Sequence, residues 1–326
     1  MSSKAWETTG VDVSRDRIVE LAATQGHDLA HLPGASFSEV VRVPEEIQRS
    51  ASAQAAAAVH GIPDEEIALF GDSAFGIAQP PRALRCYAEA LGVAPASPQE
   101  PGLLRSTGHA RLDTGALRWL GSLGGPSPSY QPGHAHCDAL AFELSAGGER
   151  VVTDSGVYEY AEGTRRQQSR ATRSHATLQV GSGEQAEIWA AHRVGGRPKV
   201  RLESWVPGAS VEGSCAGWST RTTRHYRRVE VDGSDIVVRD RLEGPPRPVQ
   251  AFLPLAPGLE PELLGSTARV ALSRGGTLRV DLPAGFEWRV ERTPYFPRFG
   301  QERPRATLAG SAAHFEAGVW RFHLEP

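Results

Sequence analysis

Cysteine is scarce in this sequence, and Cys86, Cys137 and Cys215 are the only three among 326 residues. Their odd number and their spacing fit neither a zinc ribbon nor a disulfide framework, so we expect buried free thiols. Long apolar runs are absent too, since no stretch approaches the about 18 residues that a membrane-spanning helix needs. The first residues show no basic stretch followed by an apolar core, which argues against a secretory signal.

A strong excess of one charge is also lacking. The formal net charge is −3 with histidine neutral, so nothing in the composition indicates a nucleic-acid partner. Charged residues make up 22% and hydrophobic residues 40% of the chain, which is ordinary for a globular protein. The length allows two domains, or one large β domain with a smaller partner.

The chain changes texture near residue 100. Residues 1–100 predict a helical segment, with helices over 14–25, 46–59 and 82–91. Three prolines within 93–102 are typical of a linker. From 101 to 326, short strand-like runs recur between Gly, Pro, Asp and Ser, and they predict a large antiparallel β-sandwich. The fold expected is therefore mainly β, preceded by a short α-helical segment.

Several strands of this sandwich can be placed from the sequence. The clearest hairpin runs from 226 to 239 and turns at Asp232-Gly233. The other predicted strands cover residues 139–144, 150–153, 176–180, 199–205 and 267–272.

The densest polar cluster is Gly133-His-Ala-His-Cys-Asp. If this stretch is extended, His134, His136 and Asp138 share one face, because side chains alternate along a strand. Asp154 lies at the end of one predicted strand and His175 just before another, so the fold could bring them together. Two imidazoles and a carboxylate suit Zn²⁺ in tetrahedral geometry. The alternative is a set of separate, hydrogen-bonded histidines on a polar rim, and spacing alone leaves both open.

Two tyrosines and four arginines lie between Asp154 and His175. Tyr158 and Tyr160 alternate on one face if the chain is extended. The arginines predict a basic loop that could hold an acidic sugar through bidentate contacts. A solvated loop with two amphipathic tyrosines is the alternative. These arginines are Arg165, Arg166, Arg170 and Arg173.

At these residues the sequence resembles the heparinase II/III-like family. Residues 133–144, Gly-His-Ala-His-Cys-Asp-Ala-Leu-Ala-Phe-Glu-Leu, are similar to its GHxHxDxLxFEL block. Thr153-Asp-Ser-Gly-Val-Tyr-Glu-Tyr is similar to its DSGxYxY block. Residues 170–177 resemble its RSTxxHNT block, with alanine in place of the usual Ser and Asn. The resemblance covers roughly residues 105–305, and residues 67–92 resemble the last part of the helical toroid that the family places before its sandwich.

The resemblance implies a fold, a reaction and a setting. The fold is an incomplete α/α toroid followed by an antiparallel β-sandwich, of which residues 1–100 would be a toroid remnant. The reaction is β-elimination on a uronic-acid-containing polysaccharide, so the partner would be an acidic polysaccharide or oligosaccharide. The setting would be the bacterial periplasm or cell envelope.

The resemblance also assigns roles to individual residues. It implies that His134 is the catalytic histidine, that Tyr160 acts as acid or base with Tyr158 as the fallback, and that Arg170 contacts the substrate. Asp138 is expected to orient a histidine.

A metal site follows from the same resemblance. His136, Asp154 and His175 would bind a Zn²⁺ ion that mainly braces the site.

Three functions stay open at this point. The first is a polysaccharide lyase. The second is a catalytically inactive, metal-stabilised carbohydrate-binding or structural β-sandwich left by truncation, because the carboxylate-neutralising residues of the toroid are not recognisable in residues 1–100. The third is a metal-dependent hydrolase of another kind.

Overall fold

The structure is a computed structural model that describes residues 66–77, 80–83, 102–105, 107–125 and 132–326. All of these belong to one compact unit, Ala53–Pro326. The helices expected over 14–25 and 46–59 lie outside the described residues. The third begins as a helical turn at 81–83, where the described stretch ends. None of the helices in the described ranges is long and apolar enough to cross a membrane.

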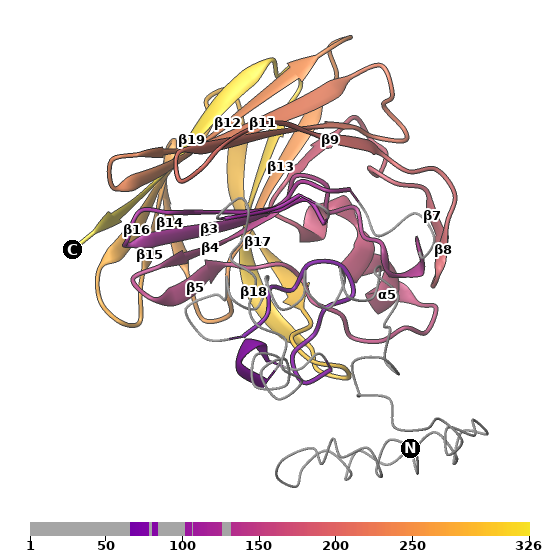
Figure 1. Cartoon of the computed structure of the whole chain (residues 1–326), viewed down its shortest axis with the longest axis horizontal. Coiled ribbons are helices and arrows are strands. Elements are labelled where there is room, and N and C mark those ends of the chain that lie inside the picture. Colours follow the sequence, from indigo (N-terminus) through magenta and orange to yellow (C-terminus); the bar gives the residue numbers. More distant parts are fainter. Residues whose placement is uncertain (1–65, 78–79, 84–101, 106, 126–131) are drawn as a thin grey trace, which may run out of the picture. The chain divides into compact units, whose positions relative to one another are not determined.

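Three antiparallel sheets and one hairpin make up the described fold (Figure 1). The five-stranded sheet follows chain order: β1 Leu103–Leu104, β2 His109–Asp113, β3 Leu117–Ser122, β4 Phe142–Ala146 and β5 Glu149–Val152. The eight-stranded sheet has the order β14 Pro261–Leu264, β15 Thr267–Ala271, β16 Thr277–Asp281, β19 Ala317–Glu325, β12 Asp235–Glu243, β11 Arg224–Asp232, β10 Ser210–Ala216 and β9 Lys199–Val206.

The four-stranded sheet has the order β17 Glu287–Tyr295, β18 Arg303–Ala312, β13 Val249–Pro254 and β6 Leu178–Val180. The separate hairpin consists of β7 Ile188–Ala190 and β8 Arg193–Val194. One short α-helix, α5 Thr164–Arg170, and two 3-10 turns, η2 Pro132–His134 and η3 Thr172–Ser174, lie between strands.

The two larger sheets enclose one hydrophobic core. Strands β11 and β12 pack on β2 and β3 (Figure 1). The rings of Phe142 on β4 and Phe322 on β19 meet edge to face at 5.8 Å, so the core side chains interdigitate between the sheets. The mainly β, antiparallel fold expected from the sequence is confirmed.

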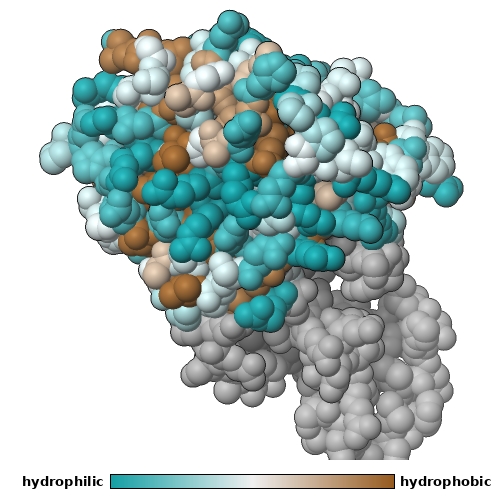
Figure 2. All heavy atoms as spheres, turned by 90° about the horizontal axis from the view of Figure 1, so that it is seen from above, coloured by the Kyte–Doolittle hydropathy of each residue, from teal (hydrophilic) through white to brown (hydrophobic). Residues whose placement is uncertain are grey.

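The outer face of the eight-stranded sheet is largely hydrophilic (Figure 2). Its arginines are neutralised by neighbouring acids, for example Arg239 and Arg228, which both pair with Glu230 at 2.7 and 3.1 Å. Val319, which faces Arg239 across β19 and β12, is an apolar side chain exposed on this sheet. The alternation of buried and exposed side chains along β11 accounts for this, because successive residues point to opposite faces.

A charged cluster lies inside the core. Asp240 accepts hydrogen bonds from His225 Nε2 at 2.7 Å, from Arg227 Nε at 2.7 Å and from Trp320 Nε1 at 2.9 Å. Each of these side chains is at most 3% exposed. Burial opposes ionisation of Asp240, but Arg227 and His225 hold its pKa below the usual range. The cluster is therefore a satisfied buried ion pair, which would be costly to break on one side only.

The predicted strands overlap the observed ones, with differences at their ends. The hairpin turns at Gly233-Ser234, one residue later than predicted, and pairs Asp232 with Asp235. Gly233 has φ +62°, which suits this turn. The strand expected over 139–144 begins only at Phe142, because Leu140 adopts φ 61° and its carbonyl accepts a hydrogen bond from Arg227.

Candidate active site and metal centre

The HxH stretch is not a strand. Residues Pro132–His134 form the 3-10 turn η2, and the Ala135 N–H closes it by donating to the Pro132 carbonyl at 3.0 Å. The expectation of an extended segment with alternating side chains was therefore wrong, since proline favours a turn here and has no N–H for a sheet ladder. His134 and His136 nevertheless converge on one carboxylate.

That carboxylate is Asp72, from the segment 66–77. His134 Nδ1 donates to its Oδ2 and His136 Nε2 to its Oδ1, both at 2.8 Å. The Arg166 guanidinium donates to both oxygens, with Nη2 2.8 Å from Oδ2. The Asp72 side chain is only 4% exposed. Burial alone would raise the pKa of Asp72, but hydrogen bonds from His136 and Arg166 hold it well below its usual range, so the acceptor is a carboxylate.

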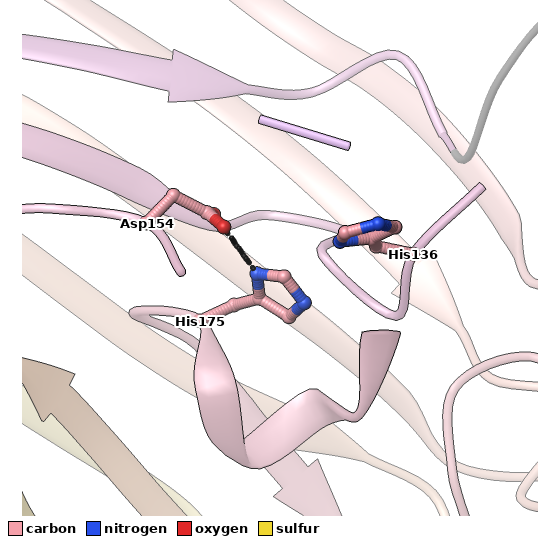
Figure 3. A group of neighbouring side chains, drawn as sticks. All are labelled: His136, Asp154 and His175. Atoms are coloured by element: carbon pink, nitrogen blue, oxygen red, sulfur yellow. Dashed lines mark hydrogen bonds and ion pairs between the residues drawn. The ribbon is translucent and has the colours of Figure 1, made fainter. Parts of the chain in front are cut away.

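The three expected metal ligands lie together in the core (Figure 3). One ligand atom each from His136, Asp154 and His175 lies within 4.8 Å of the others, and all three residues are buried. His175 Nδ1 lies 2.8 and 2.9 Å from the two oxygens of Asp154. The remaining ring nitrogens, His136 Nδ1 and His175 Nε2, are buried without a hydrogen-bond partner.

The hydrogen bonds also fix the histidine tautomers. Because His136 donates from Nε2 to Asp72, its lone pair lies on Nδ1, and because His175 donates from Nδ1 to Asp154, its lone pair lies on Nε2 when the ring is neutral. Burial lowers the pKa of His136 to about 4, which keeps its imidazole neutral. For His175, the Asp154 carboxylate outweighs burial and raises the pKa. His136 Nδ1 is thus an electron-pair donor, whereas His175 would have to release a proton to bind a metal, as protonated metal ligands do. Two buried ring nitrogens without partners, beside a carboxylate, are what a metal ion would satisfy.

Buried polar side chains hold the backbone around Asp154. Glu143 accepts from the N–H of Asp154 at 3.0 Å and from that of Leu69 at 3.1 Å. Arg305 donates to the carbonyls of Asp154 at 3.0 Å and Ser174 at 2.9 Å. These contacts join the strand end that carries Asp154 to the turn before His175 and to segment 66–77.

His134 is the exposed member of the site. Its side chain is 44% exposed, and its ring meets Tyr160 at 5.6 Å and His192 at 6.0 Å, measured between ring centroids. Tyr160 and His192 are themselves 5.6 Å apart, so the three rings form a triangle. Burial and the Asp72 charge raise the pKa of Tyr160, so its phenol stays protonated at neutral pH. Tyr158 lies elsewhere, against Phe296.

The basic loop expected between Asp154 and His175 contains a short helix followed by a turn, and its exposed arginines are paired. Arg165 bonds Glu302 at 2.6 Å and lies over the Tyr158 ring. Arg173 bonds Glu291 at 2.9 Å. The expectation of an open basic loop was therefore wrong.

The other two arginines, Arg166 and Arg170, are buried and hold backbone segments together through hydrogen bonds. Arg170 is 1% exposed and donates to the carbonyls of Ala135 at 2.8 Å, Ala190 at 2.9 Å and Ala191 at 2.8 Å. Arg166 donates to the Ala191 carbonyl at 3.0 Å as well as to Asp72. Arg170 thus does not reach the exposed surface, and this geometry gives no support to the substrate contact expected of it.

Asp138 bonds the backbone of the segment 66–77, and two of the cysteines are buried. Asp138 accepts from the Gly71 N–H at 3.2 Å, and burial raises its pKa to about 6. Among the hydrogen bonds of the described residues, those that orient site histidines come from Asp72 and Asp154, not from Asp138. Cys137 and Cys215 are buried free thiols, as expected, whereas Cys86 lies outside the described residues.

Sequence reasoning missed Asp72, Arg166 as its partner, and His192. The resemblance of residues 67–92 to a family segment was the one indication that could have drawn attention to Asp72. None of the family blocks quoted from the sequence contains His192, so nothing there drew attention to it.

Comparison with known proteins agrees with this architecture. Solved structures with the same fold include a heparan sulfate lyase HepC mutant from Pedobacter heparinus, with 17% identity and TM-score 0.65, covering 86% of this chain and 47% of that one. A structure described as heparinase III has 16% identity and TM-score 0.63, covering 86% and 48%. A heparinase III that is the BT4657 gene product has 17% identity and TM-score 0.62, covering 82% and 45%. The chain thus spans less than half the length of these proteins.

Sequence comparison identifies the family directly. No curated protein sequence matches this chain. The sequence model of the family described as "Heparinase II/III-like, C-terminal" matches residues 96–317, well over half of the chain. This chain therefore belongs to the heparinase II/III-like family.

Proposed function

We propose that this chain is the sandwich part of a polysaccharide lyase that cleaves uronic-acid-containing polysaccharides by β-elimination. The observation that carries the proposal is the exposed His134, oriented by the buried Asp72 carboxylate and adjacent to the Tyr160 phenol. Family membership supports the same reaction class.

The geometry suits the two proton transfers of β-elimination. His134 donates Nδ1–H to Asp72, so the lone pair on Nε2 is available to accept the proton alpha to the sugar carboxylate. The electron pair of that C–H bond forms the C=C bond as the glycosidic C–O bond breaks. Tyr160 is protonated at neutral pH and would give its proton to the leaving oxygen. Atoms and charges balance, because one proton is taken up and one is released.

We also propose a Zn²⁺ ion held by His136, His175 and Asp154. One ligand atom from each of these buried residues lies within 4.8 Å of the others, and His136 Nδ1 and His175 Nε2 have no hydrogen-bond partner. Binding would replace the present hydrogen bond between His175 and Asp154, because the Asp154 carboxylate lies on the Nδ1 side of the His175 ring. The ion would join three chain segments and so fix the strand end and turns behind His134; we assign it no step of the reaction.

One observation favours a second candidate, a non-catalytic, metal-stabilised carbohydrate-binding sandwich. Lyase chemistry needs a group that neutralises the sugar carboxylate. Arg166 and Arg170, which bond the site and the HxH turn, are buried and bound to Asp72 and to backbone carbonyls. Neither is available for that task in this arrangement.

The test is incubation with heparan sulfate, hyaluronan and alginate, followed by ultraviolet absorbance of the conjugated C=C bond. A lyase produces this absorbance, and His134→Ala abolishes it. Tyr158→Phe is the matched control for Tyr160→Phe, because both phenols lie close together in sequence but only Tyr160 contacts His134. Sugar binding without any unsaturated product would favour the second candidate.

A further inference from the structure

The hairpin Ile188–Val194 carries features that neither the metal ligands nor the proton transfers use. Trp189 on β7 is 61% exposed, and Arg193 on β8 lies with its guanidinium 5.6 Å from the Trp189 ring. A tryptophan is a large apolar side chain that folding normally buries. Leaving the Trp189 ring in water forgoes the free energy of burying it, which binding of a ligand to the ring would restore.

The hairpin is held firmly against the site. Arg170 and Arg166 from α5 grip its Ala190 and Ala191 carbonyls at 2.8–3.0 Å. The same two guanidinium groups bind the carbonyls of Ala135 and Gly133, on either side of His134. Figure 1 shows β7 and β8 at the edge of the molecule next to α5. The buried arginines therefore fix the distance between the hairpin and the HxH turn.

The hairpin tip reaches the reacting side chains. The turn residue His192 is exposed and completes the ring triangle with His134 and Tyr160. Trp189 is three residues away, so its Cα lies within roughly 10 Å of that of His192. An oligosaccharide bound at His134 would extend over this distance.

From these contacts we infer that the hairpin Ile188–Val194 is a substrate-binding arm, which stacks a pyranose ring on Trp189 and pairs an anionic sugar group with Arg193. The C–H-rich face of a pyranose fits the negative face of an indole, and guanidinium matches carboxylate or sulfate in a fork. The present partner of Arg193 is the ring itself, so the guanidinium can turn to an anion without breaking a buried ion pair. The inference rests on the proposed function, because it places the bound sugar at His134.

The test measures binding directly, by titration calorimetry of the whole chain with octasaccharides of heparan sulfate, hyaluronan and alginate. Trp189→Ala and Arg193→Ala should each weaken the binding of at least one of them on the order of tenfold, and the Arg193 effect should shrink at high salt. The melting temperature should not change, since both side chains are exposed. Tyr226→Ala is the matched control, because Tyr226 also stacks with an arginine, Arg241 at 3.6 Å, but on the sheet β11–β12. It should leave affinity unchanged.

Two results overturn the inference: equal affinities for wild type, Trp189→Ala and Arg193→Ala, or no binding of any of the octasaccharides. The unsaturation assay keeps the two proposals apart. Turnover that depends on His134 but not on Trp189 or Arg193 removes the arm and keeps the lyase. Binding that depends on the arm, without unsaturated product, keeps the arm and removes the lyase.

Discussion

Asp72→Asn tests whether one carboxylate holds the site together. The substitution keeps the shape but removes the charge, and leaves the Arg166 guanidinium, 1% exposed, without its counter-ion. Breaking one side of a buried ion pair costs about 3 kcal/mol or more. For a domain of this size that lowers the melting temperature by roughly 6–12 °C. The asparagine NH₂ must also face either His134 or His136 as a donor, which reverses the tautomer of that ring.

Two further readouts separate positioning from stability. Loss of a partner that orients a metal-bound histidine weakens metal binding by about 10–100-fold. Loss of the correct tautomer at His134 lowers kcat by about two to four orders of magnitude. Asp240→Asn is the matched control, because Asp240 also accepts from a histidine and an arginine in the core but lies in the eight-stranded sheet. Equal metal affinity and equal kcat in Asp72→Asn and Asp240→Asn would refute the positioning role.

Three other outcomes are expected. His136→Ala and His175→Ala should each lower the zinc content measured by mass spectrometry, and a chelator should lower the melting temperature of the wild type but not that of the variants. Stability should fall in acid in two stages, because burial depresses the pKa of His225 below 6.5 and its partners depress that of Asp240 below about 3.9. Both groups bind protons more readily when unfolded, so the stability that this pair contributes is full above about pH 6.5 and declines as the pH falls. Urea titrations across pH 3–8 measure this, and a flat profile contradicts it. Gly108→Ala should destabilise by about 2 kcal/mol or more, since its φ is +70° and the added Cβ would lie 2.0 Å from a facing Cα; an unchanged urea midpoint would count against that reading.

The strands were predictable because alternation is local. In a strand such as Thr267–Ala271, buried and exposed residues alternate, so the strand can be predicted from neighbouring residues alone. The hairpin at Gly233 can be predicted from its turn residues. The errors occurred where a long-range contact overrode the local pattern. Leu140 is turned to φ 61° while its carbonyl binds Arg227, 87 residues away, and no local rule contains that residue.

The site divides in the same way. The grouping of His136, Asp154 and His175 came from the resemblance, and the structure brings them together. The role of Asp72 was not accessible, because its hydrogen bonds to His134 and Arg166 span 62 and 94 residues. The misplaced role of Arg170 has a related cause: arginine is usually exposed, and only the tertiary structure shows that three carbonyls bury this one.

The family model begins at residue 96, but the folded domain also includes the earlier segment 66–77. Its backbone N–H groups bind the sandwich through hydrogen bonds from Leu69 to Glu143, from Gly71 to Asp138 and from Phe75 to the Pro297 carbonyl. A shortened chain that starts at residue 96 would retain everything that the family model matches, but it would lack Asp72. Among the described residues, Asp72 is the only acid that accepts hydrogen bonds from both His134 and His136. A protein cloned by the family boundaries would thus contain the matched sequence motifs, but its two histidines would lack the carboxylate that orients them.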